Sequence, residues 1–173
     1  MKTILTKYKF NAIWHFTDKS NLDLIIKHGG LLSLAEIERK GIDIPMPGGN
    51  DWSHDADKLK GFHKYVHLAF TDEHPMLFRV KQEGGILEPI WLKIDSSILL
   101  EDNVRYTSDV SNKFGVPILK PEEAREQIDF EVLFTRTDWK DPEIQARLKA
   151  ARKSEILVPD FVPIEKILGY KDG

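Results

Sequence analysis

The sequence predicts an α+β fold with a mainly antiparallel sheet. Two observations lead to this class. The expected order of elements is one strand, two short helices and then mostly strands, without the regular strand–helix alternation of a doubly wound sheet. The chain has 173 residues, of which 41% are hydrophobic, so it can bury a substantial core and is too apolar for a disordered segment. We therefore expect one domain over residues 1–173.

The first forty residues predict a strand and two helices. Residues 12–16 are apolar except for His15, which indicates a strand. Two capping boxes then predict helix starts, and glycines predict where these helices end. The two sets are Ser20 with Asp23 and Gly29, and Ser33 with Glu36 and Gly41.

Strand patterns dominate the rest of the chain. Apolar and polar residues alternate over residues 65–70 and 128–135, which is typical of strands buried on one face. Shorter apolar runs at residues 76–80, 90–94 and 155–158 are further strand candidates. These runs supply most of the expected sheet.

Composition excludes several classes of protein. Cysteine is absent, so the chain has no disulfide framework, no thiolate zinc site and no cysteine nucleophile. No apolar run is long enough to span a membrane, and the N-terminus lacks the apolar stretch of a signal peptide, so we expect a cytoplasmic location. The formal net charge is −3, so a nucleic-acid partner would need a local basic patch.

A long polar segment at residues 42–62 stands out, because such a loop in a small domain is usually functional or disordered. Histidines and aspartates in and after it suggest a metal site, but the spacing argues against one. His63 and His67 flank or lie on a strand, where four residues span about 13 Å, too far for both to bind one ion. We expect no metal site from this set, which is His54, His63 and His67 with Asp51, Asp55 and Asp57.

Two other residues are candidates for chemistry. His15 lies inside an apolar strand close to the turn into a helix, where a side chain can line a cleft; a hydrogen-bonded core histidine is the alternative. Glu155 begins a strand, where a carboxylate can act as a general base or stabilise a cation. A surface pair with Lys153 or Arg152 is the alternative for Glu155.

Three stretches of the sequence, taken together, resemble the DarT family, the toxin half of bacterial DarT–DarG toxin–antitoxin systems. The resemblance spans about residues 13–168. Its motifs are His15-Phe16-Thr17-Asp18 with Asn21-Leu22, Ile25 and Gly29-Gly30; Tyr65-Val66-His67-Leu68-Ala69-Phe70 with His74-Pro75-Met76-Leu77; and Ser154-Glu155-Ile156-Leu157-Val158-Pro159 with Val162-Pro163.

The resemblance implies a fold and an activity. The fold would be that of the ADP-ribosyltransferases, a split, mainly antiparallel β-sandwich with short helices and a central NAD cleft. The activity would be transfer of ADP-ribose from NAD to a base in single-stranded DNA, with Glu155 as the catalytic residue and no metal. A macrodomain antitoxin is the implied protein partner, and we expect a monomer. The implied NAD-binding residues are His15, Thr17, Asn21, Gly30, Phe70 and Met76.

The sequence departs from the family pattern in the segment from Pro45 to Gly61, which by resemblance would be the lid over NAD. Better-known members carry a catalytic arginine there, whereas this chain has no arginine in the lid after Ile42. Its basic residues are Lys58, Lys60 and Lys64, with Arg39 just upstream. The second catalytic group is therefore unassigned. The target base, thymine or guanine, also stays open, as do two alternatives: an RNA acceptor, and a non-catalytic module that binds NAD or nucleic acid.

A basic segment precedes Glu155. Asp141, Pro142 and Glu143 predict a helix start, and the surrounding run of Lys and Arg could contact phosphates. Trp139 could stack on an unpaired base or simply pack at the junction, and a solvated helix face is the alternative for the charges. The predicted nucleic-acid-binding residues are Trp139, Lys149, Arg152 and Lys153.

Overall fold

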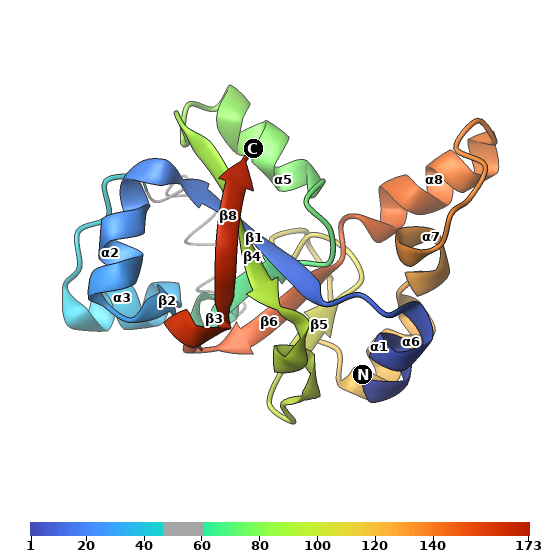
Figure 1. Ribbon diagram of the computed structural model, residues 1–173, viewed down its shortest axis with the longest axis horizontal. Helices are drawn as coiled ribbons and strands as arrows, with labels where there is room; N and C mark the ends of the chain where they lie inside the picture. Colours follow the sequence, from blue (N-terminus) through green and yellow to red (C-terminus); the bar gives the residue numbers. More distant parts are fainter. Residues whose placement is uncertain (47–60) are drawn as a thin grey trace.

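The computed structural model describes residues 1–46 and 61–173 and contains two sheets (Figure 1). The larger has the strand order β5–β6–β3–β1–β4–β8, and the smaller pairs β2 with β7. All of these neighbouring strands are antiparallel, which confirms the predicted fold class. The strands are β1 (Ala12–Asp18), β2 (Gly30–Leu32), β3 (Tyr65–Ala69), β4 (Pro89–Asp95), β5 (Arg105–Thr107), β6 (Glu155–Pro159), β7 (Phe161–Pro163) and β8 (Ile167–Asp172).

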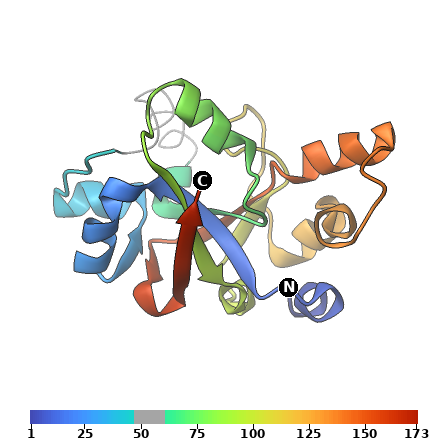
Figure 2. The same cartoon turned by 45° about the horizontal axis from the view of Figure 1, so that its top comes forward.

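Short helices surround the larger sheet. In both views α2 and α3 lie with β2 at one end, and α1, α6, α7 and α8 gather at the other (Figures 1 and 2). Within the described ranges, no helix is both long and apolar enough to cross a membrane. The helices are α1 (Lys2–Tyr8), α2 (Leu22–Lys27), α3 (Leu34–Lys40), α5 (Pro75–Gln82), α6 (Pro121–Gln127), α7 (Phe130–Phe134) and α8 (Pro142–Ala151), with 3₁₀ turns η1 (Lys19–Asn21), η2 (Phe62–Lys64), η3 (Ser96–Leu100) and η4 (Ile164–Lys166).

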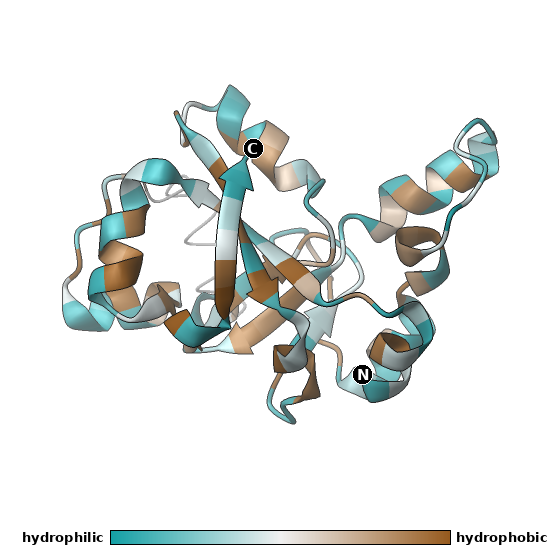
Figure 3. Ribbon diagram, viewed as in Figure 1, coloured by the Kyte–Doolittle hydropathy of each residue, from teal (hydrophilic) through white to brown (hydrophobic). Residues whose placement is uncertain are grey.

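The larger sheet buries an apolar cluster on each face. Side chains alternate along β1, so Ile13 joins the main cluster, whereas Trp14 and Phe16 pack in the second cluster below α5. Strand β4 divides in the same way, with Trp91 in the second cluster. Apolar residues accordingly concentrate on the central strands, while β8 turns polar toward its end (Figure 3). Because both faces of the sheet are buried, the central strands carry apolar side chains on both sides, which explains their nearly continuous apolar sequences.

The sheet splits between β1 and β3. These neighbours share a single paired position, Trp14 with Ala69, whereas β1 pairs with β4 over its whole length. Beyond that position a side chain replaces the main-chain ladder, because His15 Nδ1 lies 2.8 Å from the carbonyl oxygen of His67. The divergence of two central strands opens the space in which the candidate site lies.

Two of the three predicted helix caps are confirmed. Ser33 accepts the backbone N–H of Glu36 at the start of α3, and Asp141 accepts that of Glu143 at the start of α8. The third was wrong. Asp18, and not Ser20, is the cap after β1, and its carboxylate accepts both the backbone N–H and the hydroxyl of Ser20.

Two predicted strands are helices. Residues 128–135 contain α7, because Asp129 caps it by accepting the N–H of Val132, and an i, i+4 pair of phenylalanines is apolar in either geometry. Residues 76–80 lie in α5, which begins at Pro75 with His74 as its cap. In both cases a cap outweighed a short apolar run that fits a strand equally well.

Candidate active site

Two adjoining cavities lie at the split of the sheet. The larger has a volume of about 230 Å³ and the smaller about 110 Å³. His15 and His67 line both, so these two side chains stand at the junction. The larger cavity is mostly apolar, with walls from α2, β2 and α3, while Glu155 and His74 line the smaller one.

A hydrogen-bond network closes one wall of the larger cavity. The side-chain amide of Asn21 donates to Thr17 Oγ1 at 3.0 Å and to the carbonyl oxygen of Met46 at 2.7 Å. Because Thr17 Oγ1 accepts this bond, its own hydroxyl proton remains available to a ligand. Asn21 therefore ties the chain near Met46 to the end of β1 and orients a donor toward the cavity.

His15 presents an acceptor to the junction. Its Nδ1 must donate to the carbonyl oxygen of His67, since a carbonyl only accepts, which leaves Nε2 with a lone pair. Burial lowers the pKa of His15 to about 4, so the ring is neutral at physiological pH. A neutral Nε2 suits a ribose hydroxyl or an amide N–H.

Glu155 is a buried carboxylate held from several sides. Its Oε2 lies 2.9 Å from His67 Nδ1, and Oε1 accepts the backbone N–H of Ser111 at 3.3 Å. Burial acts to raise the pKa of Glu155, but the hydrogen bond and charge of His67, with smaller contributions from His74 and Ser111, outweigh it and lower that pKa. Glu155 is therefore ionised at neutral pH although its side chain is only 6% exposed.

His74 touches the other carboxylate oxygen. Its Nε2 lies 3.8 Å from Glu155 Oε1 and 3.4 Å from the carbonyl oxygen of Lys153, while its Nδ1 accepts the N–H of Met76 as the cap of α5. One proton, on Nε2, satisfies all three contacts. Burial lowers the pKa of His74, in agreement with a neutral ring.

The structure brings together most of the residues that the sequence predicted for NAD. His15, Thr17, Asn21 and Gly30 line the larger cavity, and Met76 lines the smaller one beside Glu155. Phe70 is elsewhere. It is 3% exposed and packs edge-on against Phe130 in the main core, outside the residues that line either cavity.

A steric constraint explains why residue 30 is a glycine. Its backbone φ is +148°, and a Cβ atom there would lie 2.0 Å from the carbonyl oxygen of Val162 on the paired strand β7. Only glycine allows β2 and β7 to approach this closely. Gly30 therefore shapes the wall of the larger cavity through the backbone.

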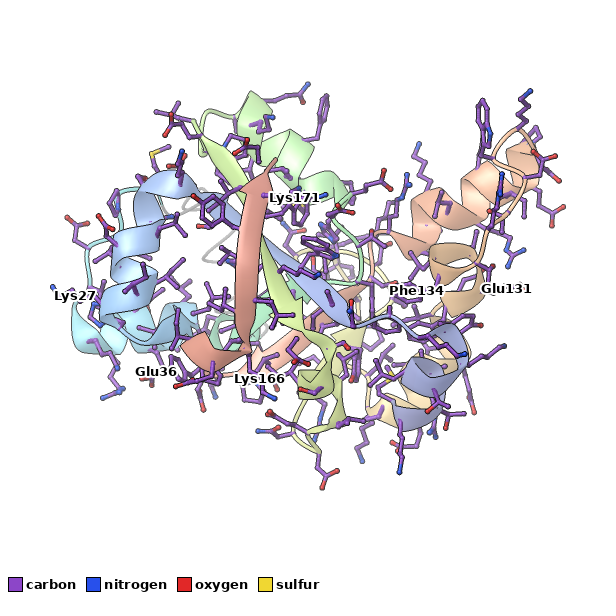
Figure 4. The ribbon with its side chains drawn as sticks, viewed as in Figure 1. Lys27, Glu36, Glu131, Phe134, Lys166 and Lys171 are labelled. Atoms are coloured by element: carbon purple, nitrogen blue, oxygen red, sulfur yellow. The ribbon has the colours of Figure 1, made fainter. Side chains whose placement is uncertain are left out.

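The predicted nucleic-acid residues lie on and beside α8, which projects from the body of the protein (Figure 1). Trp139 is 70% exposed, with Lys140 Nζ 5.5 Å from the centre of its ring. Lys149 is exposed, while Arg152 pairs with Glu73 and the carbonyl of Lys153 contacts His74. Arg147 of α8 pairs with Glu131, which Figure 4 shows at the α7–α8 end of the molecule, away from Lys171 on β8.

The remainder of the lid and of the metal set lies outside the described residues. That applies to the lid lysines Lys58 and Lys60 and to His54, Asp51, Asp55 and Asp57. No group of three potential metal ligands occurs within residues 1–46 and 61–173.

Sequence reasoning missed four residues of the smaller cavity: His67 as a partner of Glu155, His74, Ser111 and Asn112. The partner of His67 is 88 positions away in the chain, so only the pairing of β3 with β6 brings the two together. A local signal was available for His74. A residue directly before a proline that begins a helix is a cap candidate, and His74 precedes Pro75 at the start of α5.

A split antiparallel sheet with a buried, ionised glutamate in a cavity at the split is the arrangement expected of the ADP-ribosyltransferase fold. A family model described as DarT, ssDNA thymidine ADP-ribosyltransferase, matches residues 14–170. The chain belongs to the DarT family. No curated protein sequence matches it.

Solved structures agree on the fold. The chain is similar to Thermosipho africanus DarTG in complex with ADP-ribose, with a TM-score of 0.69 and 21% identity over 93% of this chain and 43% of that one. It is also similar to Thermus sp. 2.9 DarT in complex with NAD⁺ (TM-score 0.59, 21% identity, 91% of this chain and 79% of that one). A third similar structure is the same DarT in complex with ADP-ribosylated ssDNA (TM-score 0.57, 21% identity, 91% of this chain and 78% of that one). The chain thus spans less than half of the DarTG chain.

Proposed function

We propose that this chain transfers ADP-ribose from NAD to a thymine base in single-stranded DNA. The observation that carries the proposal is the buried, ionised Glu155 in the smaller cavity, hydrogen-bonded to His67 at the junction with the larger one. The family description names the same reaction class and thymidine as its target. Two related structures, with NAD⁺ and with ADP-ribosylated ssDNA, support the donor and the acceptor.

The larger cavity fits the adenosine side of the donor. Its apolar walls would cover a purine, while the Thr17 hydroxyl and His15 Nε2 offer a donor and an acceptor for polar groups of the ligand. His63 lines the same cavity, and its buried Nδ1 has no hydrogen-bond partner among the described residues. These groups would fix the donor with its reactive ribose near Glu155.

The reaction breaks the bond between ribose C1′ and the nicotinamide nitrogen, and nicotinamide leaves with the bonding electrons. A base nitrogen forms the new bond to C1′ and releases a proton. Positive charge develops on the ribose along this path, and the Glu155 carboxylate would stabilise it more in the transition state than in the ground state. The same carboxylate would accept the proton.

Glu155→Gln tests the proposal, because it keeps the shape of the side chain and removes the charge. With labelled NAD and a thymine-containing single-stranded oligonucleotide, we expect transfer to fall at least about 100-fold. Glu101→Gln is the control, since Glu101 is an exposed carboxylate at the end of η3. Wild-type labelling by the Glu155→Gln protein would refute the catalytic role.

Matched oligonucleotides test the acceptor. We expect labelling of single-stranded DNA that contains thymine, and none of DNA in which guanine replaces it. Labelling of RNA and not of DNA would establish the RNA alternative. Binding of NAD without release of nicotinamide would establish a non-catalytic module.

The exposed surface of α8 would guide the acceptor strand. An exposed indole with Lys140 beside its ring is a stacking platform for unpaired bases, which supports Trp139 as a strand contact, and Lys149 is an exposed cation on α8.

A second protein would restrain the enzyme. The related DarTG chain is more than twice as long as the region matched. We infer from this length, and from the resemblance to the DarT–DarG systems, a toxin whose partner is a macrodomain antitoxin.

A further inference from the structure

His67 differs from the other histidines of the site in its hydrogen bonding. Its Nε2 lies 3.2 Å from the carbonyl oxygen of Phe62, and its Nδ1 lies 2.9 Å from Glu155 Oε2. A carbonyl oxygen and a carboxylate oxygen only accept, whereas a neutral imidazole has a single N–H to give. Both contacts are satisfied together only when the ring carries two protons.

We propose that His67, at the junction of the two cavities, is a positioning residue that as an imidazolium clamps the Glu155 carboxylate in the smaller cavity, so that transfer depends on the proton of His67. The inference rests on the transferase function proposed above, which gives Glu155 its role. It assigns to a histidine the cationic partner that the lid sequence does not supply as an arginine.

The sheet explains why the clamp is rigid. In the β3–β6 ladder His67 pairs with Leu157 and Ala69 with Glu155, so the His67 and Glu155 side chains are diagonal neighbours on one face. The bond to Phe62 fixes the ring from behind. The carbonyl of His67 meanwhile accepts from His15, so one residue holds both a donor-binding and a catalytic side chain.

No other described side chain fits this part as well. Within the described ranges, the side chains within 4 Å of the Glu155 carboxylate that can carry a positive charge are His67 and His74. His74 completes its contacts as a neutral ring. Arg152 is close in sequence, but it pairs with Glu73.

Two amide variants separate orientation from charge. An asparagine amide nitrogen lies near the position of Nδ1, so His67→Asn keeps a neutral donor to Glu155. A glutamine amide nitrogen lies near Nε2, so His67→Gln keeps the bond to Phe62 and loses that to Glu155. We expect kcat to fall in both, and at least tenfold further in His67→Gln than in His67→Asn.

The pH profile of kcat tests the proton. The titratable groups that face His67 in the described part of the chain are Glu155 from β6, His15 from β1 and His74 at the start of α5, and His63 lines the shared cavity. If His67 must be protonated, wild-type kcat falls as the pH rises through its titration. That fall should be absent in His67→Asn and kept in the control Glu101→Gln, since Glu101 is exposed and lines neither cavity. An unchanged fall in His67→Asn, or equal kcat in the two amide variants, would overturn the proposal.

A measurement on the wild-type protein keeps the proposal testable without activity. With ¹⁵N-histidine labelling, we expect both ring nitrogens of His67 to be protonated at pH 7, and the pKa of this ring to fall in Glu155→Gln. The His67 signals are those lost in His67→Asn. A neutral His67 ring at pH 7 would overturn the clamp even in an active enzyme. Failure to label DNA with a doubly protonated ring would instead count against the proposed function.

Discussion

Replacing Asp18 by Asn should destabilise the protein far more than a surface substitution does. The Asp18 side chain is buried, and its carboxylate accepts four hydrogen bonds. Two come from the N–H and hydroxyl of Ser20, and two from the N–H groups of Leu87 and Glu88. An asparagine has one acceptor oxygen, so in either orientation its amide group would face N–H donors.

The structure sets the magnitude. Burial acts to raise the pKa of Asp18, but the bonds from Ser20, Glu88 and Leu87 lower it from 3.8 to about 2. That difference corresponds to about 2 kcal/mol of stability at neutral pH. Unsatisfied N–H groups add roughly 1 kcal/mol, so we expect a loss of about 3 kcal/mol. For a chain of this length, Tm should fall by roughly 6–12 °C.

Chemical denaturation and thermal melts check this prediction, with Asp95→Asn as the matched control. Asp95 caps η3 by accepting the N–H of Ser97, and because asparagine caps about as well as aspartate, its substitution should cost less than about 1 kcal/mol. Because the pKa of Asp18 is lowered in the folded state, its contribution is complete above pH 4–5 and is lost as the pH falls toward 2, about half being lost by roughly pH 3. Equal losses in the two variants, or a difference from wild type that does not shrink below pH 4, would refute the reasoning.

Two further predictions concern the cavity wall and the α8 surface. Gly30→Ala should cost roughly 2–4 kcal/mol in urea unfolding and weaken NAD binding, because the added Cβ meets the Val162 carbonyl. Gly29→Ala, with open space around its Cβ and only backbone strain, should cost about 1 kcal/mol, and equal effects would contradict the steric argument. Trp139→Ala should raise KM for the oligonucleotide about tenfold, equivalent to roughly 1.4 kcal/mol of lost stacking, with KM for NAD unchanged. An unchanged oligonucleotide KM would remove α8 from the proposed DNA path.

Elements with strong local signals were predictable from the sequence. The strand with His15 and the helix caps at Ser33 and Asp141 needed only apolar runs or a cap beside its own helix. Short elements gave no such signal: β2 and β5 have three residues each, and tertiary pairing alone defines them. The alternation at residues 128–135 misled because an i, i+4 pair of phenylalanines fits both periods.

The candidate site divided along the same line. Glu155 and His15 were found because each belongs to a motif with a strand around it, whereas the hydrogen-bond partners of Glu155 come from distant segments. Phe70 lies outside the lining of both cavities because strand alternation places it beside Val66 and Leu68 in the main core, as the alternation in the sequence already indicated.

The split between β1 and β3 accounts for the character of the whole site. Central strands that diverge expose main-chain groups that a ladder would otherwise pair, and such groups need partners when they are buried. One such group is the His67 carbonyl, which accepts a hydrogen bond from His15 Nδ1. This bond fixes the tautomer of His15 and leaves the lone pair on Nε2 for the cavity. The two cavities lie at the same divergence, and the His67 side chain, which is hydrogen-bonded to Glu155, lines both of them. A substitution that removes this side-chain donor, such as His15→Phe, would break the bond to the His67 carbonyl and would therefore disturb both cavities at once, since His15 and His67 line both.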